Sequence, residues 1–151
     1  MLFRKYTTWI LIADGARAHI IANDGPGKGL KPVPGREYTG INLPTREIGT
    51  DKPGRTFDRA GVGRHAKEPR VDWHQFEKHK FARSMAKVLD KAAGNGAFDR
   101  LVLVAPPQTL GELRGALDKK TRARITAESA KDLTNLSIHE LPEHLSEVVR
   151  L

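Results

Sequence analysis

The stretch Thr7–Ala22, TTWILIADGARAHIIA, decides the topology of this 151-residue chain. Its first part is a nearly continuous apolar run that stops at Asp14-Gly15, as a buried strand does when it enters a turn. A second apolar run, Ala16–Ala22, follows directly. Two short apolar runs on either side of an Asp-Gly pair predict an antiparallel hairpin.

Further strand and helix signals follow this hairpin. Leu30–Tyr38 predicts a third strand, and its two prolines restrict it to an edge of the sheet because proline cannot donate a ladder hydrogen bond. Val71–Ala93 contains no glycine or proline, and its apolar residues recur at helical spacing. Asp72 is expected to cap this long helix, and Gly94-Asn95-Gly96 is expected to end it.

The last third of the chain alternates between strand and helix patterns. The expected elements are a buried strand at Phe98–Ala105, a short helix at Leu110–Leu117, a strand at Arg122–Glu128 and a last helix at Pro142–Leu151. A hairpin followed by right-handed crossovers forms a mixed sheet with helices on its faces. We therefore expect a single α/β domain over residues 1–151, with the element order of ribonuclease-H-like folds.

Composition narrows the class of protein. The chain has 26 Lys and Arg against 18 Asp and Glu, a net charge of +8, which favours an anionic partner. The absence of cysteine excludes disulfides and thiolate metal sites. No run approaches the roughly 20 apolar residues of a membrane span. The apolar patch Trp9–Ala13 is also too short for the core of a signal peptide, so a cytoplasmic location is expected.

The basic charge concentrates in a long loop and the helix that follows it. Residues 40–70 read as an irregular segment with several Gly and Pro, and ordered loops of this length are usually functional. Residues 46–91 hold twelve Lys or Arg and seven acids, a balance of +5. On the helix, Lys80, Arg83, Lys87 and Lys91 recur on one stripe. Such a loop and stripe suit a phosphate backbone, and the alternative is an ordinary solvated helix face.

Within the loop, residues 61–65 read GVGRH. Glycines let a backbone approach a ligand closely, an arginine grips phosphate, and a histidine can hydrogen-bond or carry a proton. The alternative is a flexible hinge with no ligand. The predicted nucleic-acid-binding residues are Arg55, Arg59, Gly61, Gly63, Arg64, His65, Lys80, Arg83 and Lys87.

No complete catalytic site is recognisable in the sequence. A two-metal nuclease needs clustered carboxylates, and Asp14 and Glu77 are suitably placed. The strand beside Asp14, however, ends in Ala105-Pro106-Pro107 without an acid, and Asp14 is more simply a turn residue. Two pairs of histidines, His74 with His79 and His139 with His144, are each five residues apart, so neither pair shares a helix face well. We therefore predict no catalytic residue, metal site or cofactor.

Seven segments together resemble a known bacterial family, the host attachment proteins, which are described as required for attachment to host cells. The segments are IADGARA (Ile12–Ala18), DKPGRTF (Asp51–Phe57), GRHA (Gly63–Ala66), Phe81-Ala82, LVLVAPP (Leu101–Pro107), LGELR (Leu110–Arg114) and KDLT (Lys131–Thr134). That family is similar in turn to the middle domain of archaeal and eukaryotic peptide-release factors. There, a loop ending in Gly-Gly-Gln precedes a long basic helix and reaches the peptidyl-transferase centre of the ribosome.

This resemblance implies a ribonuclease-H-like sheet and a ribosomal RNA or tRNA partner for the basic loop and helix. The chain departs from the release-factor pattern, because Val62 splits the glycines and Arg64 stands where the glutamine would follow. Three functions remain open: RNA or ribosome binding, peptidyl-tRNA hydrolysis assisted by His65, and non-enzymatic attachment to host cells. The last would require export of the protein.

Overall fold

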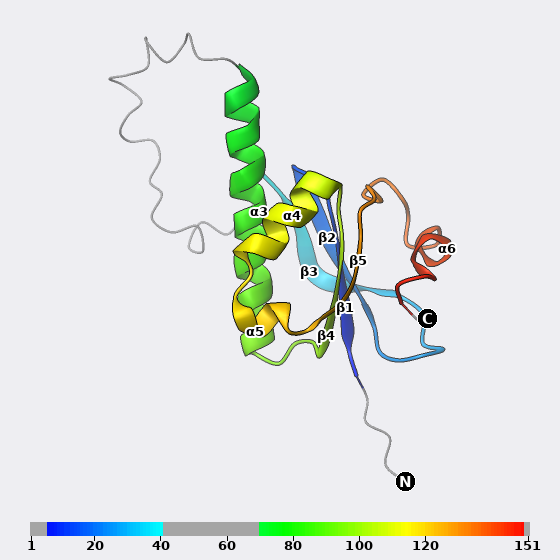
Figure 1. Cartoon of the computed structure of the whole chain (residues 1–151). Coiled ribbons are helices and arrows are strands. Elements are labelled where there is room, and N and C mark those ends of the chain that lie inside the picture. Colours follow the sequence, from blue (N-terminus) through cyan, green and yellow to red (C-terminus); the bar gives the residue numbers. More distant parts are fainter. Residues whose placement is uncertain (1–5, 41–69, 150–151) are drawn as a thin grey trace.

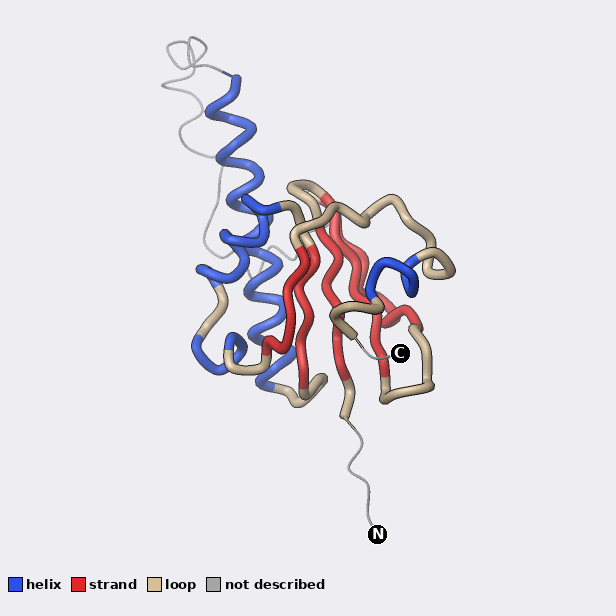
Figure 2. The backbone as a smooth tube through the Cα atoms, turned by 45° about the vertical axis from the view of Figure 1, so that its right-hand side comes forward, coloured by secondary structure: helices blue, strands red, loops and turns tan. Residues whose placement is uncertain are grey.

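The structure, a computed structural model, describes residues 6–40 and 70–149, and for residues 70–77 it describes the backbone alone. It contains one open five-stranded sheet in the order β3-β2-β1-β4-β5, with helices on both faces (Figures 1 and 2). The elements are β1 (Thr8–Ala13), β2 (Arg17–Asn23), β3 (Lys31–Thr39), α3 (Arg70–Gly94), β4 (Arg100–Val104), α4 (Pro107–Ala116), α5 (Lys119–Arg122), β5 (Ile125–Ser129) and α6 (Leu141–Leu145). The predicted α/β class and mixed sheet are confirmed.

The predicted hairpin forms the centre of the sheet. β1 and β2 pair antiparallel, with Trp9 opposite Ala22. The turn between them closes through a hydrogen bond of 2.9 Å from the Asp14 N–H to the Arg17 carbonyl. The Asp14 carboxylate stabilises the same turn by accepting bonds of 2.7 Å from the backbone N–H groups of Ala16 and Arg17.

The other strands extend this hairpin in both directions. β3 pairs antiparallel with β2 and lies at one edge of the sheet, which confirms the edge position predicted from its prolines. On the other side, β4 pairs parallel with β1, and β5 pairs parallel with β4. The carboxyl ends of β1, β4 and β5 therefore meet at one edge of the molecule.

Side chains alternate along the strands and build a core on each face of the sheet. On one face, Trp9 and Leu11 pack with the buried side of α3, and the ring of Phe98 lies 5.1 Å from that of Trp9. On the other face, Ile10 and Ile12 pack against the segment that contains α6. The long helix α3 thus covers the first face and extends past the sheet at its N-terminal end (Figures 1 and 2).

Several predicted helix boundaries were wrong. α3 begins at Arg70, so Asp72 lies inside its first turn and is not the residue that precedes it. α4 begins at Pro107, earlier than predicted, because proline suits the first helical position, where no N–H bond is needed. The last helix is a single short one, Leu141–Leu145, and the chain continues from it in turns.

A short helix, α5, occupies residues that were expected to form a connection and the start of a strand. Asp118 caps α5 by accepting a hydrogen bond of 2.8 Å from the Thr121 N–H. The following strand begins at Ile125, three residues after the predicted Arg122.

Candidate functional site

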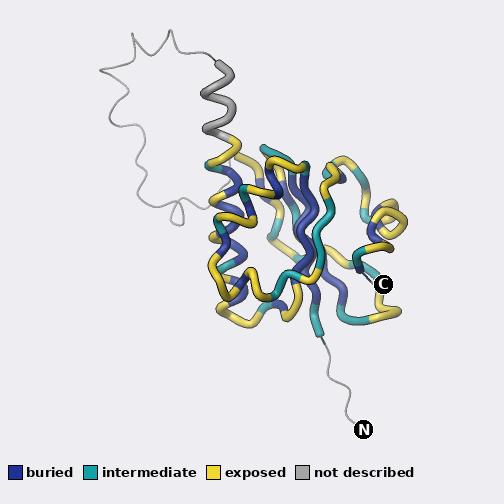
Figure 3. Tube along the Cα trace, viewed as in Figure 1, coloured by how far each residue is buried: buried dark blue, intermediate teal, exposed yellow. Residues whose placement is uncertain are grey.

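One side of α3 faces the sheet and α4, and the other side faces solvent (Figure 3). Arg83, Lys87 and Lys91 are exposed, and Lys80 is half-buried. At 1.5 Å per residue, the row from Lys80 to Lys91 is about 16 Å long. We call these four residues the basic face of α3. The predicted stripe of cations is thus presented on the outside of the molecule.

The basic surface continues from α3 onto α5. The Asp90 carboxylate on α3 accepts a hydrogen bond of 3.1 Å from the Asp118 N–H, which holds the start of α5 beside α3. Lys119, Lys120 and Arg122 on α5 are all exposed. The sequence did not reveal this extension, since nothing in the local pattern indicated a helix at residues 119–122.

The structure brings together only part of the predicted site. Lys80, Arg83 and Lys87 lie in one row on α3. The six other predicted residues lie outside the described residues; they are Arg55, Arg59, Gly61, Gly63, Arg64 and His65. The predicted hydrolytic use of His65 therefore stays a prediction.

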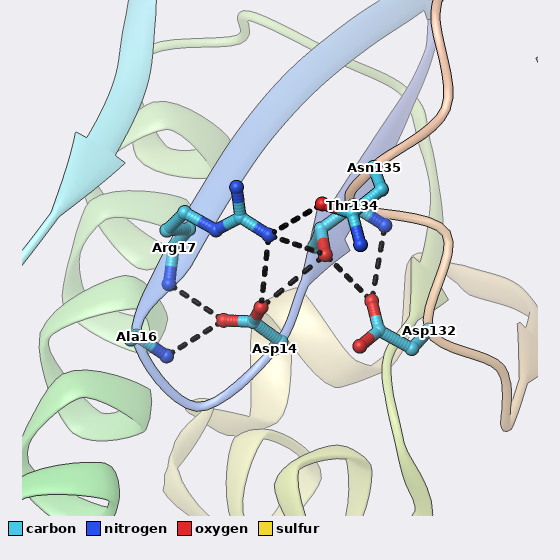
Figure 4. Close-up of polar contacts among 6 residues, drawn as sticks. All are labelled: Asp14, Ala16, Arg17, Asp132, Thr134 and Asn135. Carbon is cyan, nitrogen blue, oxygen red and sulfur yellow. Dashed lines mark hydrogen bonds and ion pairs between the residues drawn. The ribbon is translucent and has the colours of Figure 1, made fainter.

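A polar cluster joins the β1–β2 turn to the chain that follows β5 (Figure 4). The Arg17 guanidinium donates to Thr134 Oγ1 at 3.2 Å and to Asn135 Oδ1 at 2.9 Å. Thr134 Oγ1 also lies 3.2 Å from Asp14 Oδ2 and 2.6 Å from Asp132 Oδ1. These contacts join residues up to 120 positions apart and fix the C-terminal segment to the end of the sheet.

The Asp14 carboxylate is the centre of this cluster. Its burial alone would raise its pKa, but the hydrogen bonds from Ala16, Arg17 and Thr134 and the nearby Arg17 guanidinium outweigh that effect, so its pKa is lowered below the ordinary 3.8. The Arg17 nitrogen NH2 lies 3.5 Å from Asp14 Oδ2. The carboxylate is thus ionised and already engaged by several donors, as befits a structural turn residue.

A pocket of about 370 Å³ opens beside this cluster, at the carboxyl ends of β1 and β4. The β1–β2 turn supplies one wall with Asp14, Gly15 and Ala16, and α3 supplies Lys78. A Cβ at Gly15 would lie 2.8 Å from Lys78 Cγ, so the Lys78 side chain would have to move away from the turn. Glycine therefore allows Lys78 to lie against the turn.

The opposite wall of the pocket comes from the start of α4 and from the chain after β5. It is lined by Pro106, Gln108, Thr109 and Glu112, together with Asp132. Four of the segments that carry the family resemblance contribute to this pocket: IADGARA, LVLVAPP, LGELR and KDLT. Sequence reasoning did not find the pocket, because its walls come from distant parts of the chain.

The described residues hold no group of three or more His, Asp or Glu placed to bind a metal ion. In the same part of the chain, no helix is both long enough and apolar enough to span a bilayer.

Comparison with known proteins identifies the chain at the level of its family. A search of curated proteins finds no match. The family described as "protein required for attachment to host cells" matches residues 9–145. This range contains all the described helices and all the strands, apart from the first residue of β1. On this match, the chain belongs to the family of proteins required for attachment to host cells.

Proposed function

We propose that this protein binds RNA through the basic face of α3, with ribosomal RNA or tRNA as the partner. The observation that carries the proposal is the row of Lys80, Arg83 and Lys87 on the outward side of a helix whose other side is buried. Within the described residues, none of these three side chains forms an ion pair with a carboxylate. Their charge is therefore available to an external anion.

Phosphate is the anion that this geometry suits best. Cations three and four residues apart on a helix lie about 5–6 Å from one another, so a row of them can follow successive phosphates of one strand. Lys119, Lys120 and Arg122 broaden the surface at its C-terminal end. Contacts of this kind position a nucleic acid without reading its bases, so we expect binding with little sequence preference.

The topology agrees with the proposed relationship to release factors. An antiparallel β3-β2-β1 half continued by parallel β4 and β5 is the arrangement expected of a ribonuclease-H-like sheet. In the release-factor domain that the family resembles, the long basic helix likewise follows the reaching loop. We propose this relationship as the origin of the fold and of the basic helix.

The family description concerns attachment to host cells, and we propose that this role is indirect. The protein would act on RNA in the cytoplasm and alter the production of the factors that attach. Fractionation of cells tests this part: the protein is expected in the cytosolic fraction, and its recovery on the cell surface would instead favour direct attachment.

RNA binding is tested with a matched pair of variants. Arg83→Glu with Lys87→Glu replaces two exposed cations of the basic face by two anions, and it leaves the half-buried Lys80 in place. Lys28→Glu with Lys131→Glu makes the same charge change at exposed positions in other parts of the fold. We expect the first variant to weaken binding of purified ribosomal RNA at least tenfold and the second to change it little. Equal losses in the two variants would show that net charge alone is responsible.

A further inference from the structure

The pocket beside the Asp14 cluster lies where α/β sheets of this kind bind ligands. From β1, the chain first proceeds to β2 on one side and later returns through α3 to β4 on the other side. The crevice at the carboxyl ends of β1 and β4 is therefore the point where the strand order reverses. At about 370 Å³, the pocket has the volume of a small-molecule site.

The wall formed by α4 offers hydrogen-bond donors. Thr109 is 93 % buried (7 % exposed) and lines the pocket, and among the described residues its hydroxyl has no hydrogen-bond partner. Among the described residues, Thr121 Oγ1 is the one fully enclosed side-chain oxygen or nitrogen without a partner, so the Thr109 oxygen is not fully enclosed and a ligand in the pocket can reach it. The N-terminus of α4 lies at the same wall and has no side-chain cap, which leaves the positive end of the helix facing the pocket. Lys78 adds a cation on the facing wall.

The acidic groups of the pocket are acceptors. Asp132 and Glu112 line it, and each has one oxygen already engaged: Asp132 Oδ1 accepts from the Thr134 N–H at 3.1 Å, and Glu112 Oε2 lies 3.2 Å from His79 Nδ1. Asp14 is different, because it already accepts from several protein donors. A ligand for this pocket thus needs an anionic group for Lys78 and the α4 terminus, and hydroxyl groups for Asp132 and Glu112.

We propose that this pocket binds a phosphorylated sugar, either free or as part of a nucleotide. The phosphoryl group lies at the start of α4, where it accepts from Thr109 Oγ1 and contacts the Lys78 ammonium. The sugar hydroxyls donate to Asp132 and Glu112. An unsubstituted phosphate ion binds less well, because the three carboxylates of the pocket, Asp14, Glu112 and Asp132, repel it and no hydroxyl offsets that repulsion.

This site is separate from the basic face of α3. Lys78 contacts the Gly15 turn on the side of α3 that faces the sheet. Arg83 and Lys87 are exposed on the side of α3 that faces solvent. The proposal therefore does not depend on RNA binding, and either can fail without the other.

Calorimetric titration of the full chain with ribose 5-phosphate, adenosine 5′-monophosphate, ribose and inorganic phosphate tests the proposal. We expect the two sugar phosphates to bind at least tenfold more tightly than ribose or phosphate. Equal affinity for ribose 5-phosphate and adenosine 5′-monophosphate indicates a free sugar phosphate as ligand. Tighter binding of the nucleotide indicates that the base contributes. Failure of both to bind at millimolar concentration would overturn the proposal.

Three variants assign the binding to this pocket. Thr109→Val removes the hydroxyl at nearly constant shape, and Lys78→Met removes the ammonium while keeping the aliphatic chain against Gly15. Each is expected to weaken binding about tenfold, the usual effect of one lost bond to a charged group. Lys28→Met makes the same change at an exposed position between β2 and β3, outside the pocket and the basic face, and should leave the affinity unchanged. Binding that survives both pocket variants, or that is lost in Lys28→Met, would contradict the assignment.

Discussion

Replacing Asp14 by alanine should lower the free energy of unfolding. This one carboxylate connects two distant segments, the β1–β2 turn and residues 132–135. It accepts two bonds of 2.7 Å from the turn backbone and one of 3.2 Å from Thr134. It also lies 3.5 Å from the Arg17 guanidinium, which in turn bonds to Asn135 at 2.9 Å. Without the carboxylate, the turn and the residue 132–135 segment lose their common partner.

The expected cost is about 2 kcal/mol of unfolding free energy. The two bonds from the turn backbone are exposed to solvent, so each contributes about 1 kcal/mol, the usual net value of a hydrogen bond, and together they give about 2 kcal/mol. The Asp14 side chain is 20 % exposed and the Arg17 side chain is 50 % exposed, so solvent screening reduces the contribution of their ion pair to a small fraction of that value. Asp14→Asn keeps one acceptor for the turn and loses the charge, and we expect it to cost about half as much.

Urea denaturation followed by circular dichroism measures both variants against the wild type, with the slope m expected to stay constant. The pH dependence adds a second criterion. Because the pKa of folded Asp14 lies below 3.8, its contribution is fully present above that pH and is lost as the pH falls through the folded pKa. Asp14→Asn should lack this acid-dependent loss. An Asp14→Ala variant as stable as the wild type would refute the proposed role of the cluster.

Two further predictions concern the core and a half-buried histidine. Phe98→Ala should lower the unfolding free energy by about 3–5 kcal/mol in urea denaturation, because Phe98 is 1 % exposed and packs on Trp9; a loss below 1 kcal/mol would show that the site collapses without cost. Burial, aided by Arg17 and opposed by Glu37, lowers the pKa of His19 below 6.5. The neutral imidazole therefore contributes stability that is fully present above pH 6.5 and is lost on acidification. His19→Gln should flatten the dependence of the unfolding free energy on pH just below pH 6.5, and an unchanged dependence would contradict this.

The parts of the fold that sequence predicted correctly depend on local signals. The apolar runs around Asp14-Gly15 form the hairpin, and the prolines of β3 place it at an edge. The apolar face of α3 contains the buried residues Phe81, Met85 and Leu89. In each case, the signal lies within one short segment of the chain: an apolar run, a pair of prolines or an apolar periodicity.

The incorrect parts depend on tertiary contacts. α5 has only four residues, and it is held by the Asp118 cap and by the contact of Asp118 with Asp90 on α3. In the C-terminal segment, Leu145 and Val149 are buried, but turns take the place of the expected helix after Leu145. Hydrophobic periodicity identifies which residues face the core, and it does not distinguish a helix from successive turns over so few residues.

The candidate sites show the same division. The basic face of α3 was visible as a spacing of charges within one helix. The pocket and the Asp14 cluster were not, because Asp14 meets Thr134 across 120 positions of sequence, and only the folded sheet brings their segments together. A local pattern predicts one face of one element, whereas a site with several walls requires the topology.

The central claim, RNA binding through α3, is tested most directly by sedimenting ribosomes from lysate and measuring the protein that accompanies them at about 50 and about 200 mM salt. Three phosphate contacts, from Lys80, Arg83 and Lys87, predict that affinity falls roughly 20- to 40-fold between these salt concentrations. We expect clear association at the lower salt and little at the higher. Absence of the protein from the ribosomal pellet at both, or association that salt does not weaken, would contradict phosphate binding by the basic face.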